Sequence, residues 1–334
     1  MKAFLRDLIN LTNDYRGAHN RKSLLNNNLH KVRVSSHRGT YNDFITDQTP
    51  NRSGIVGNTI FYNGLFPDFD FVVNKPNLTI NYKRNKSFLL HIEPPSYINK
   101  LGLSSPKILN KFNKIYTSDP YLIDKADERF IASPPFVHWH LGSNSHINKV
   151  KDEFLIDYDF LIKATYPKKT DNLATINSNL MNIDGHKIRA EFLEKFCNTQ
   201  YNFNLYGGSK WARFNQYIDN APNGKWFPFS KSRYILVIEN EKAPFYWSEK
   251  FSDAILSFAT PIYYGCTNIS DYFPEGSYYP IDINKKDCIE EIINVVESDF
   301  HEKNLSQLIK ARDLIFEKYN MFSFMNKVIN QQLK

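Results

Sequence analysis

The sequence predicts an α/β protein with two domains, each built around a mostly parallel sheet. Candidate strands and candidate helices alternate along most of the chain, which is the pattern of parallel sheets covered by helices. A chain of 334 residues is long enough for two domains that each bury a core. We expect the first domain over residues 1–160, the second over 161–300, and helices that pack back on the body over 301–334.

The first domain is expected to contain short strands that alternate with helices. Four segments have the β-branched and aromatic content of strands: 31–35, 69–73, 87–93 and 114–118. The third segment ends at Glu93, because Pro94 and Pro95 cannot continue a strand. A carboxylate is therefore expected at the carboxyl end of a strand in this domain. Ser105 and Pro106 stand in the N-cap and N1 order that is favoured at the start of a helix.

The second domain is expected to begin with a strand, a long helix and another strand. The two strand candidates are residues 173–176 and 203–206. In the helix between them, Ile188, Phe192 and Phe196 share one face, and Arg189 lies in the first turns.

A strand-helix-strand unit over residues 234–264 is the clearest local pattern in the chain. A strand at 234–239 runs into a polar loop, and Ser248 then stands at the N-cap position of a helix. Four apolar residues at helical spacing give this helix one buried face: Phe251, Ala254, Ile255 and Phe258. Glu249 and Lys250 lie in its first turn, where free N–H groups and the helix dipole favour an anion. We therefore expect a diphosphate at this helix N-terminus.

The loops after Ile176 and Glu239 should face one crevice, because ligands of doubly wound sheets bind outside the carboxyl ends of the strands. Arg189 and Lys250 would then converge. Two cations and two helix N-termini can stabilise a departing diphosphate without a metal ion. Taken singly, each cation would more often be an ordinary solvated surface residue, and it is their pairing that favours the diphosphate site.

The charge balance favours an anionic partner. The chain has 42 Lys and Arg against 35 Asp and Glu, a net charge of +7. Sugar nucleotides, acidic lipid surfaces and nucleic acids would all suit this charge. The sequence has no RNA-binding signature, no zinc-finger spacing and no basic block of five residues, so we expect no nucleic-acid partner.

Cysteine content and hydropathy favour a cytoplasmic location. Three cysteines cannot form a complete disulfide framework. Arg6 and Asp7 interrupt the N-terminal stretch, which has no signal-peptide core, and no apolar run approaches membrane-spanning length. The terminal helices carry cations beside large apolar residues. They could contact the inner face of a membrane peripherally or pack back on the domains, and the oligomeric state stays open.

The unit over residues 234–264 and the residues that follow it resemble the α-1,3/4-fucosyltransferase family. That family has a Phe-Glu-Asn-Ser strand end and then Tyr-x-Thr-Glu-Lys opening a helix; this chain reads Ile-Glu-Asn-Glu at 238–241 and Tyr-Trp-Ser-Glu-Lys at 246–250. Further matches in order and spacing are Ala254, 260–262, 264–265 and 273–274. The clearest departure is Glu241, where the family has Ser. The resemblance is weaker around Glu93 and almost absent over residues 1–86.

The resemblance implies the GT-B architecture, two Rossmann-like domains facing a cleft, with acceptor on the first domain and nucleotide-sugar on the second. It also implies an inverting transfer of L-fucose from GDP-fucose to a glycan hydroxyl. The acceptor would be O3 of an N-acetylglucosamine in a surface glycan such as a lipopolysaccharide O-antigen. No cofactor and no obligatory metal are implied.

The resemblance further implies roles for six residues. Glu93 matches by position the family's general base, which deprotonates the acceptor hydroxyl. Five further residues would bind the donor. Arg189 and Lys250 would bind its diphosphate, and Asn240, Tyr246 and Glu249 would bind its ribose and sugar.

Several alternatives remain open at this point. Glu241 adds a carboxylate beside the expected sugar pocket, so a different nucleotide-sugar could be the donor. A catalytically inactive glycan-binding protein of the same fold is the alternative from another class. His138 and His140 share a strand face at the spacing of a metal pair, but core packing explains them better, because no Cys or Asp at ligand spacing joins them nearby. The Asp-x-Asp triplets at 68–70 and 157–159 could be read as metal-binding motifs of another glycosyltransferase fold.

Overall fold

The computed structural model describes residues 28–36, 39–40, 42–64, 66–77, 80–136, 138–142 and 156–333. These residues form two compact units, each with its own sheet. The first unit comprises the described residues of 28–138, 157–162 and 318–333, and the second comprises those of 139–156 and 163–317. Among the described residues, no helix combines the length and hydropathy that crossing a bilayer requires. The predicted α/β class, with two units that are each built on a mostly parallel sheet and with helices at the C-terminal end, is confirmed.

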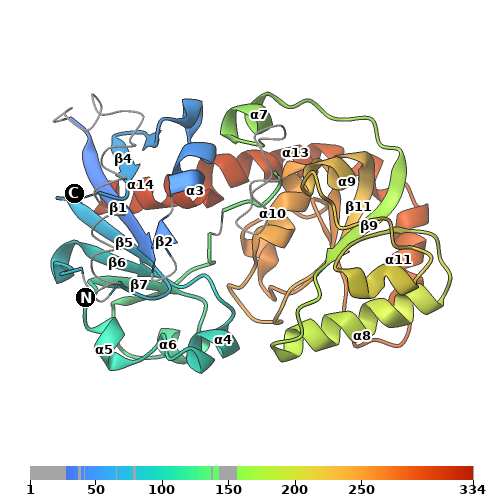
Figure 1. Cartoon of the computed structure of the whole chain (residues 1–334), viewed down its shortest axis with the longest axis horizontal. Coiled ribbons are helices and arrows are strands. Elements are labelled where there is room, and N and C mark those ends of the chain that lie inside the picture. Colours follow the sequence, from blue (N-terminus) through green and yellow to red (C-terminus); the bar gives the residue numbers. More distant parts are fainter. Residues whose placement is uncertain are drawn as a thin grey trace. The chain divides into compact units, whose positions relative to one another are not determined.

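The sheet of the first unit has the order β3-β4-β1-β5-β6-β7-β8, with β2 paired to β1 (Figure 1). Pairing is parallel from β4 to β8 and antiparallel at β2 and β3. The strands are β1 (His30–Ser36), β2 (Gly39–Thr40), β3 (Ile55–Val56), β4 (Thr59–Tyr62), β5 (Phe69–Val73), β6 (Ser87–Leu90), β7 (Lys114–Thr117) and β8 (Phe130–Ala132).

The helices of the first unit are short, apart from the last. They are α3 (Asn42–Asp47), α4 (Pro95–Lys100), α5 (Pro106–Leu109), α6 (Pro120–Ile123), α7 (Tyr158–Lys163) and α14 (Met321–Gln332). In α14, Asn320 caps the N-terminus through the N–H groups of Phe322 and Ser323. The Phe322 ring packs on Phe61 of β4, with 5.1 Å between the ring centroids. A helix from the end of the chain therefore completes the core of the first unit.

The strand predicted over residues 87–93 ends earlier, at Leu90. The N–H of His91 still donates to the carbonyl of Tyr116 on β7, at 2.9 Å. The N–H of Ile92 instead donates to the side chain of Asn74, at 2.8 Å. Because a side chain takes the place of the neighbouring strand there, the ladder stops and Glu93 lies in the loop that follows.

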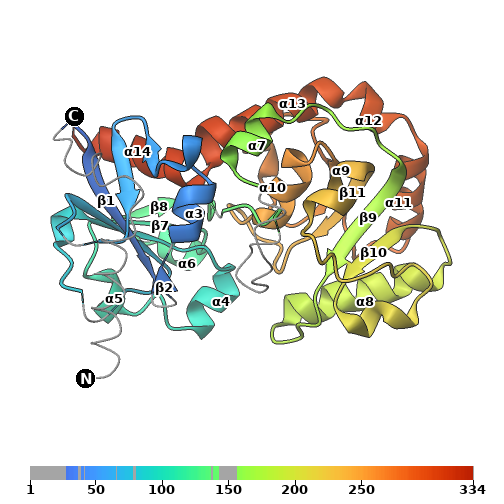
Figure 2. The same ribbon diagram turned by 45° about the horizontal axis from the view of Figure 1, so that its top comes forward.

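The sheet of the second unit is entirely parallel and has the order β10-β9-β11-β12-β13; Figure 2 labels β10, β9 and β11. Its strands are β9 (Asp171–Asn177), β10 (Asn204–Gly207), β11 (Ser232–Ile238), β12 (Thr260–Tyr264) and β13 (Tyr279–Pro280). Its helices are α8 (Asp184–Asn198), α9 (Trp226–Lys231), α10 (Glu249–Leu256), α11 (Cys288–Glu297), α12 (Phe300–Lys303) and α13 (Leu305–Leu314). Strand order reverses between β9 and β11, which makes this pair the topological switch point of the sheet.

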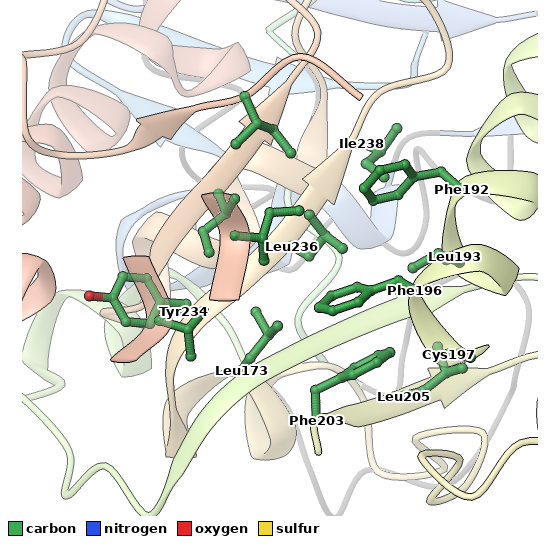
Figure 3. Close-up of a cluster of buried hydrophobic side chains, with 14 of the residues drawn as sticks. Leu173, Phe192, Leu193, Phe196, Cys197, Phe203, Leu205, Tyr234, Leu236 and Ile238 are labelled. Carbon is green, nitrogen blue, oxygen red and sulfur yellow. The ribbon is translucent and has the colours of Figure 1, made fainter. Parts of the chain in front are cut away.

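The core of the second unit lies between one face of the sheet and helices α8 and α11. Leu236 and Ile238 alternate along β11 with residues that face the other side, and they meet Phe192 and Phe196 of α8 (Figure 3). The predicted position of Ile188 on this face is wrong, because its side chain is 47% exposed. Arg189 takes the inward position in that turn and is 7% exposed.

Candidate active site

The two central strands of the second unit separate toward their carboxyl ends. Backbone pairing of β9 with β11 ends at Ala174 and Ile235. Beyond this point the hydroxyl of Thr175 donates to the carbonyl of Leu236, at 2.9 Å. A side chain thus replaces the ladder at the switch point, which is the place where open parallel sheets bind ligands.

Arg189 bridges the separated strand ends. Its Nε donates to Oδ1 of Asn177, the last residue of β9, at 2.8 Å. Its Nη1 donates to the carbonyl of Ile238, the last residue of β11, at 3.2 Å, and to Oδ1 of Asn240 at 2.8 Å. Burial lowers the pKa of the guanidinium, against the opposing effect of Glu239, yet arginine stays charged in proteins. Among the residues that the structure describes, no hydrogen bond of Nη2 is found.

The first turn of α8 lies directly against the loop after β11. A Cβ atom on Gly185 would come within 1.7 Å of the carbonyl oxygen of Asn240, so only glycine fits there. This contact brings the N-terminus of α8 to the end of β11, where its unpaired backbone N–H groups favour an anion.

The N-terminus of α10 is built on a buried carboxylate. Glu239 is 2% exposed and accepts the N–H of Ser248 at 2.8 Å and its hydroxyl at 2.6 Å. The Ser248 oxygen in turn caps α10 by accepting the N–H of Lys250, which confirms the predicted N-cap. Gly265 leaves room for this arrangement, since a Cβ there would lie 2.5 Å from Cγ of Glu239.

Lys250 is held beside this cap. Its Nζ lies 3.0 Å from Oγ of Ser248, 3.1 Å from Oε1 of Glu249 and 3.6 Å from Oε2 of Glu239. Its side chain is 24% exposed, so the ammonium can also reach a ligand. Burial raises the pKa of Glu239, and Lys250 opposes this rise. Burial acts in the same direction on Glu249, but Lys250, Lys225 and His140 outweigh it and hold the pKa of Glu249 well below its usual value.

A second cation-carboxylate pair lies in the same region. Nζ of Lys225 is 2.8 Å from Oδ2 of Asp253, and Oδ1 of Asp253 accepts the N–H of His140 at 2.9 Å. Burial disfavours the charged Lys225, but Asp253 outweighs it, so its pKa is raised. Lys225 lines a cavity of about 20 Å³ together with Arg189 and Lys250. That volume holds roughly one water molecule.

His186 lies near the cations of this site. Burial, and then the charges of Arg189, Lys250 and Lys210, lower the pKa of His186 to about 4. The imidazole is therefore neutral near pH 7.

Four of the five predicted donor residues are joined by contacts at this edge of the second sheet. Arg189 bonds to Asn240, and Glu249 pairs with Lys250. The fifth, Tyr246, is 2% exposed and acts electrostatically on Arg189. Glu239, Asn177 and the Lys225–Asp253 pair were not predicted as part of the site. A carboxylate at position 253, between apolar residues of an amphipathic helix, was a signal that a buried cation should accompany it.

Glu93 belongs to the first unit and follows β6. It is partly exposed, and its Oε1 accepts a hydrogen bond from Nδ2 of Asn74, at 3.4 Å. The prediction that Glu93 ends the strand is wrong, because β6 ends three residues earlier, at Leu90.

The residues considered as metal ligands have other contacts. Asp70 forms a buried ion pair with Arg33, at 2.7 Å, and Asp157 accepts the N–H of Phe160. The ring of His138 lies on that of Phe44, with centroids 3.4 Å apart. Within the described residues, no group of three or more His, Cys, Asp or Glu side chains is arranged to hold a metal ion.

No protein-family model matches the sequence, and a search of curated proteins finds no similar one. Solved structures do match over most of the chain. An α1,3-fucosyltransferase with GDP-fucose is 18% identical, covers 92% of this chain and 90% of its own, and has a TM-score of 0.48. A structure of an α1,3-fucosyltransferase with GDP is 16% identical, covers 91% of this chain and 92% of its own, and has a TM-score of 0.49. The T4 phage BGT in complex with UDP-glucose is 12% identical, with 91% and 99% coverage and a TM-score of 0.46.

Proposed function

We propose that this protein is an inverting glycosyltransferase that moves L-fucose from GDP-fucose to a glycan hydroxyl. The observation that carries the proposal is the pair of cations at the switch point of the second sheet. Arg189 lies in the second turn of α8 and Lys250 in the first turn of α10, and both line one small cavity. The sequence resemblance over residues 238–274 gives the donor class.

In this proposal the second unit binds the donor. Nη2 of Arg189, Nζ of Lys250 and the N-termini of α8 and α10 bind the diphosphate. Asn240, Tyr246 and Glu249 orient ribose and sugar. As the bond from the anomeric carbon to the diphosphate breaks, its electron pair stays on the phosphate oxygen, and these groups stabilise the added charge. No acid is needed to protonate such a leaving group.

The acceptor hydroxyl, proposed as O3 of N-acetylglucosamine in a surface glycan, attacks the anomeric carbon from the opposite side. Its proton passes to the carboxylate of Glu93, so one protein carboxylate is enough for inversion. We propose that this happens in the cytoplasm, on a glycan such as a lipopolysaccharide O-antigen under assembly at the inner face of the membrane.

A panel of nucleotide-sugars tests the donor assignment. Transfer should be fastest with GDP-fucose, and GDP should bind more tightly than UDP. A preference for another donor would retain the reaction class and assign Glu241 to sugar selection. Glycan binding without transfer or hydrolysis of any nucleotide-sugar would favour the inactive glycan-binding alternative.

A further inference from the structure

We propose that Asn74 is the residue that positions Glu93 for proton transfer. The inference rests on the proposed role of Glu93 as the base. Asn74 follows β5 directly and is 6% exposed. Its two amide atoms contact consecutive residues after β6: Oδ1 accepts the N–H of Ile92 at 2.8 Å, and Nδ2 donates to Oε1 of Glu93 at 3.4 Å.

The backbone at Asn74 is bent into an uncommon turn. Its φ is 60°, in the left-handed region, and the N–H of Lys75 donates to the carbonyl of Val73 at 2.8 Å. A three-residue turn of this hand is rare and strained, and asparagine tolerates such a φ better than most residues other than glycine. Strain of this kind concentrates at functional sites. Here the turn directs a buried amide toward the segment that carries Glu93.

The segment before Glu93 is fixed from both neighbouring strands. On the β5 side, Asn74 holds Ile92 through its side chain and bonds to the carbonyl of Leu90 through its backbone N–H. On the β7 side, Nδ1 of His91 lies 3.0 Å from Oγ1 of Thr117. After Glu93, Pro94 and Pro95 start α4. The backbone that carries the Glu93 side chain is therefore held in place on both sides.

The amide of Asn74 also favours the form of Glu93 that a base needs. A donated N–H stabilises an ionised carboxylate over a neutral one and restricts its orientation. His91 adds no charge nearby near neutral pH, because burial lowers its pKa to about 3. Ionisable residues that follow these strands in the chain include Lys75 after β5 and Asp119 after β7, and α4, which follows Glu93, carries Tyr97 and Lys100.

Asn74→Asp separates the two contacts of this side chain. Aspartate keeps the oxygen that accepts the Ile92 N–H and tolerates the same φ, so the fold should be retained, while the charge at this buried position should lower the melting temperature. It replaces the N–H donor with a second carboxylate beside Glu93. We expect kcat to fall about 10- to 100-fold through misplacement of the base, with KM for the donor unchanged. The acid limb of the pH–rate profile should move to higher pH, because a neighbouring like charge disfavours ionisation.

Asn113→Asp is the matched control, since it adds the same charge to the same unit at a residue that bonds to Gln332. A carboxyl ¹³C NMR titration of Glu93 gives a readout that needs no activity, and its midpoint should rise in Asn74→Asp and stay at the parental pH in Asn113→Asp. An unchanged midpoint, or parental kcat in Asn74→Asp while Glu93→Gln is inactive, overturns the role of Asn74 and leaves the proposed base intact. Parental turnover in Glu93→Gln instead overturns the base assignment and this inference with it.

Discussion

Nη1 of Arg189 lies 2.8 Å from Oδ1 of Asn240, so a side chain from α8 is bonded to the loop that follows β11. The same guanidinium bonds to Asn177 at the end of β9. One residue therefore connects two strands whose ladder has stopped, and it does so where the diphosphate is proposed to bind. Its removal should affect both stability and binding.

Arg189→Ala should lower the free energy of unfolding by about 2–4 kcal/mol, because it leaves buried acceptors at Asn177 and Ile238 without a donor. It should also weaken GDP binding. Urea unfolding and calorimetric titration measure the two effects. Lys187→Ala, at an exposed residue of the same helix, should change neither. Parental stability in Arg189→Ala would contradict the bridging role.

Lys250→Ala should weaken GDP binding by about 1.5–3 kcal/mol, the range of a hydrogen bond to a charged group, with a smaller effect on stability. The side chain is partly exposed, so little of its burial is lost. Lys242→Ala is the control, because Lys242 lies in the loop before α10 and pairs with Asp282 on the surface. Equal affinities for GDP in the two variants would move the diphosphate site elsewhere.

Glu93→Gln should bind GDP and acceptor normally and transfer sugar about 10²- to 10⁴-fold more slowly, the usual cost of losing a positioned general base. Single-turnover rates with saturating substrates measure this. Glu128→Gln, at an exposed carboxylate of the same unit, should keep the parental rate. If Glu93→Gln keeps it too, Glu241 is the next carboxylate to test.

GDP binding should be insensitive to chelators, because side-chain cations and helix N-termini supply the positive charge in the proposed site. Calorimetric titration with and without excess EDTA compares the two affinities. Loss of binding in EDTA, restored by manganese, would return attention to the Asp-x-Asp triplets.

Stability should fall as pH drops from about 6.5 to 4, and His301 should account for part of the slope. Its ring is buried between the hydroxyls of Tyr166 and Thr260, and burial lowers its pKa from 6.5 to about 4. As the pH falls, the His301 side chain is protonated at a higher pH in the unfolded chain than in the folded one. The stability that this residue contributes above pH 6.5 is therefore lost between about pH 6.5 and 4. At 1.36 kcal/mol per unit the full loss is on the order of 3 kcal/mol. Unfolding curves of His301→Gln should show a shallower pH dependence; an unchanged slope would exclude this residue.

Local signals were enough to predict the unit from β11 to β12. The N-cap at Ser248 and the apolar spacing of Phe251 and Ala254 depend on neighbours a few residues away, and the structure reproduces both. These signals also placed Lys250 at the helix N-terminus. The helix and the N-cap that carry Lys250 could therefore be predicted from one continuous segment.

Contacts between distant residues account for what the sequence did not predict. The strand before Glu93 ends early because Asn74, 18 residues before Ile92, takes the N–H of Ile92. Lys225 and Asp253 are 28 residues apart, and nothing local indicates that they pair. Ile188 is exposed because the neighbouring Arg189, and not Ile188, contacts the end of β11 from this part of α8.

The position of α14 in the first unit has a consequence for synthesis on the ribosome. Phe322 and Asn326 complete the core and edge of that unit through Phe61 and Thr59, yet they are translated after the whole of the second unit. Domains generally fold as units as they emerge, N-terminal ones first. Here the first unit lacks α14 until the second unit has been translated, so we expect the nascent chain to expose the apolar surface around Phe61 until α14 has left the exit tunnel.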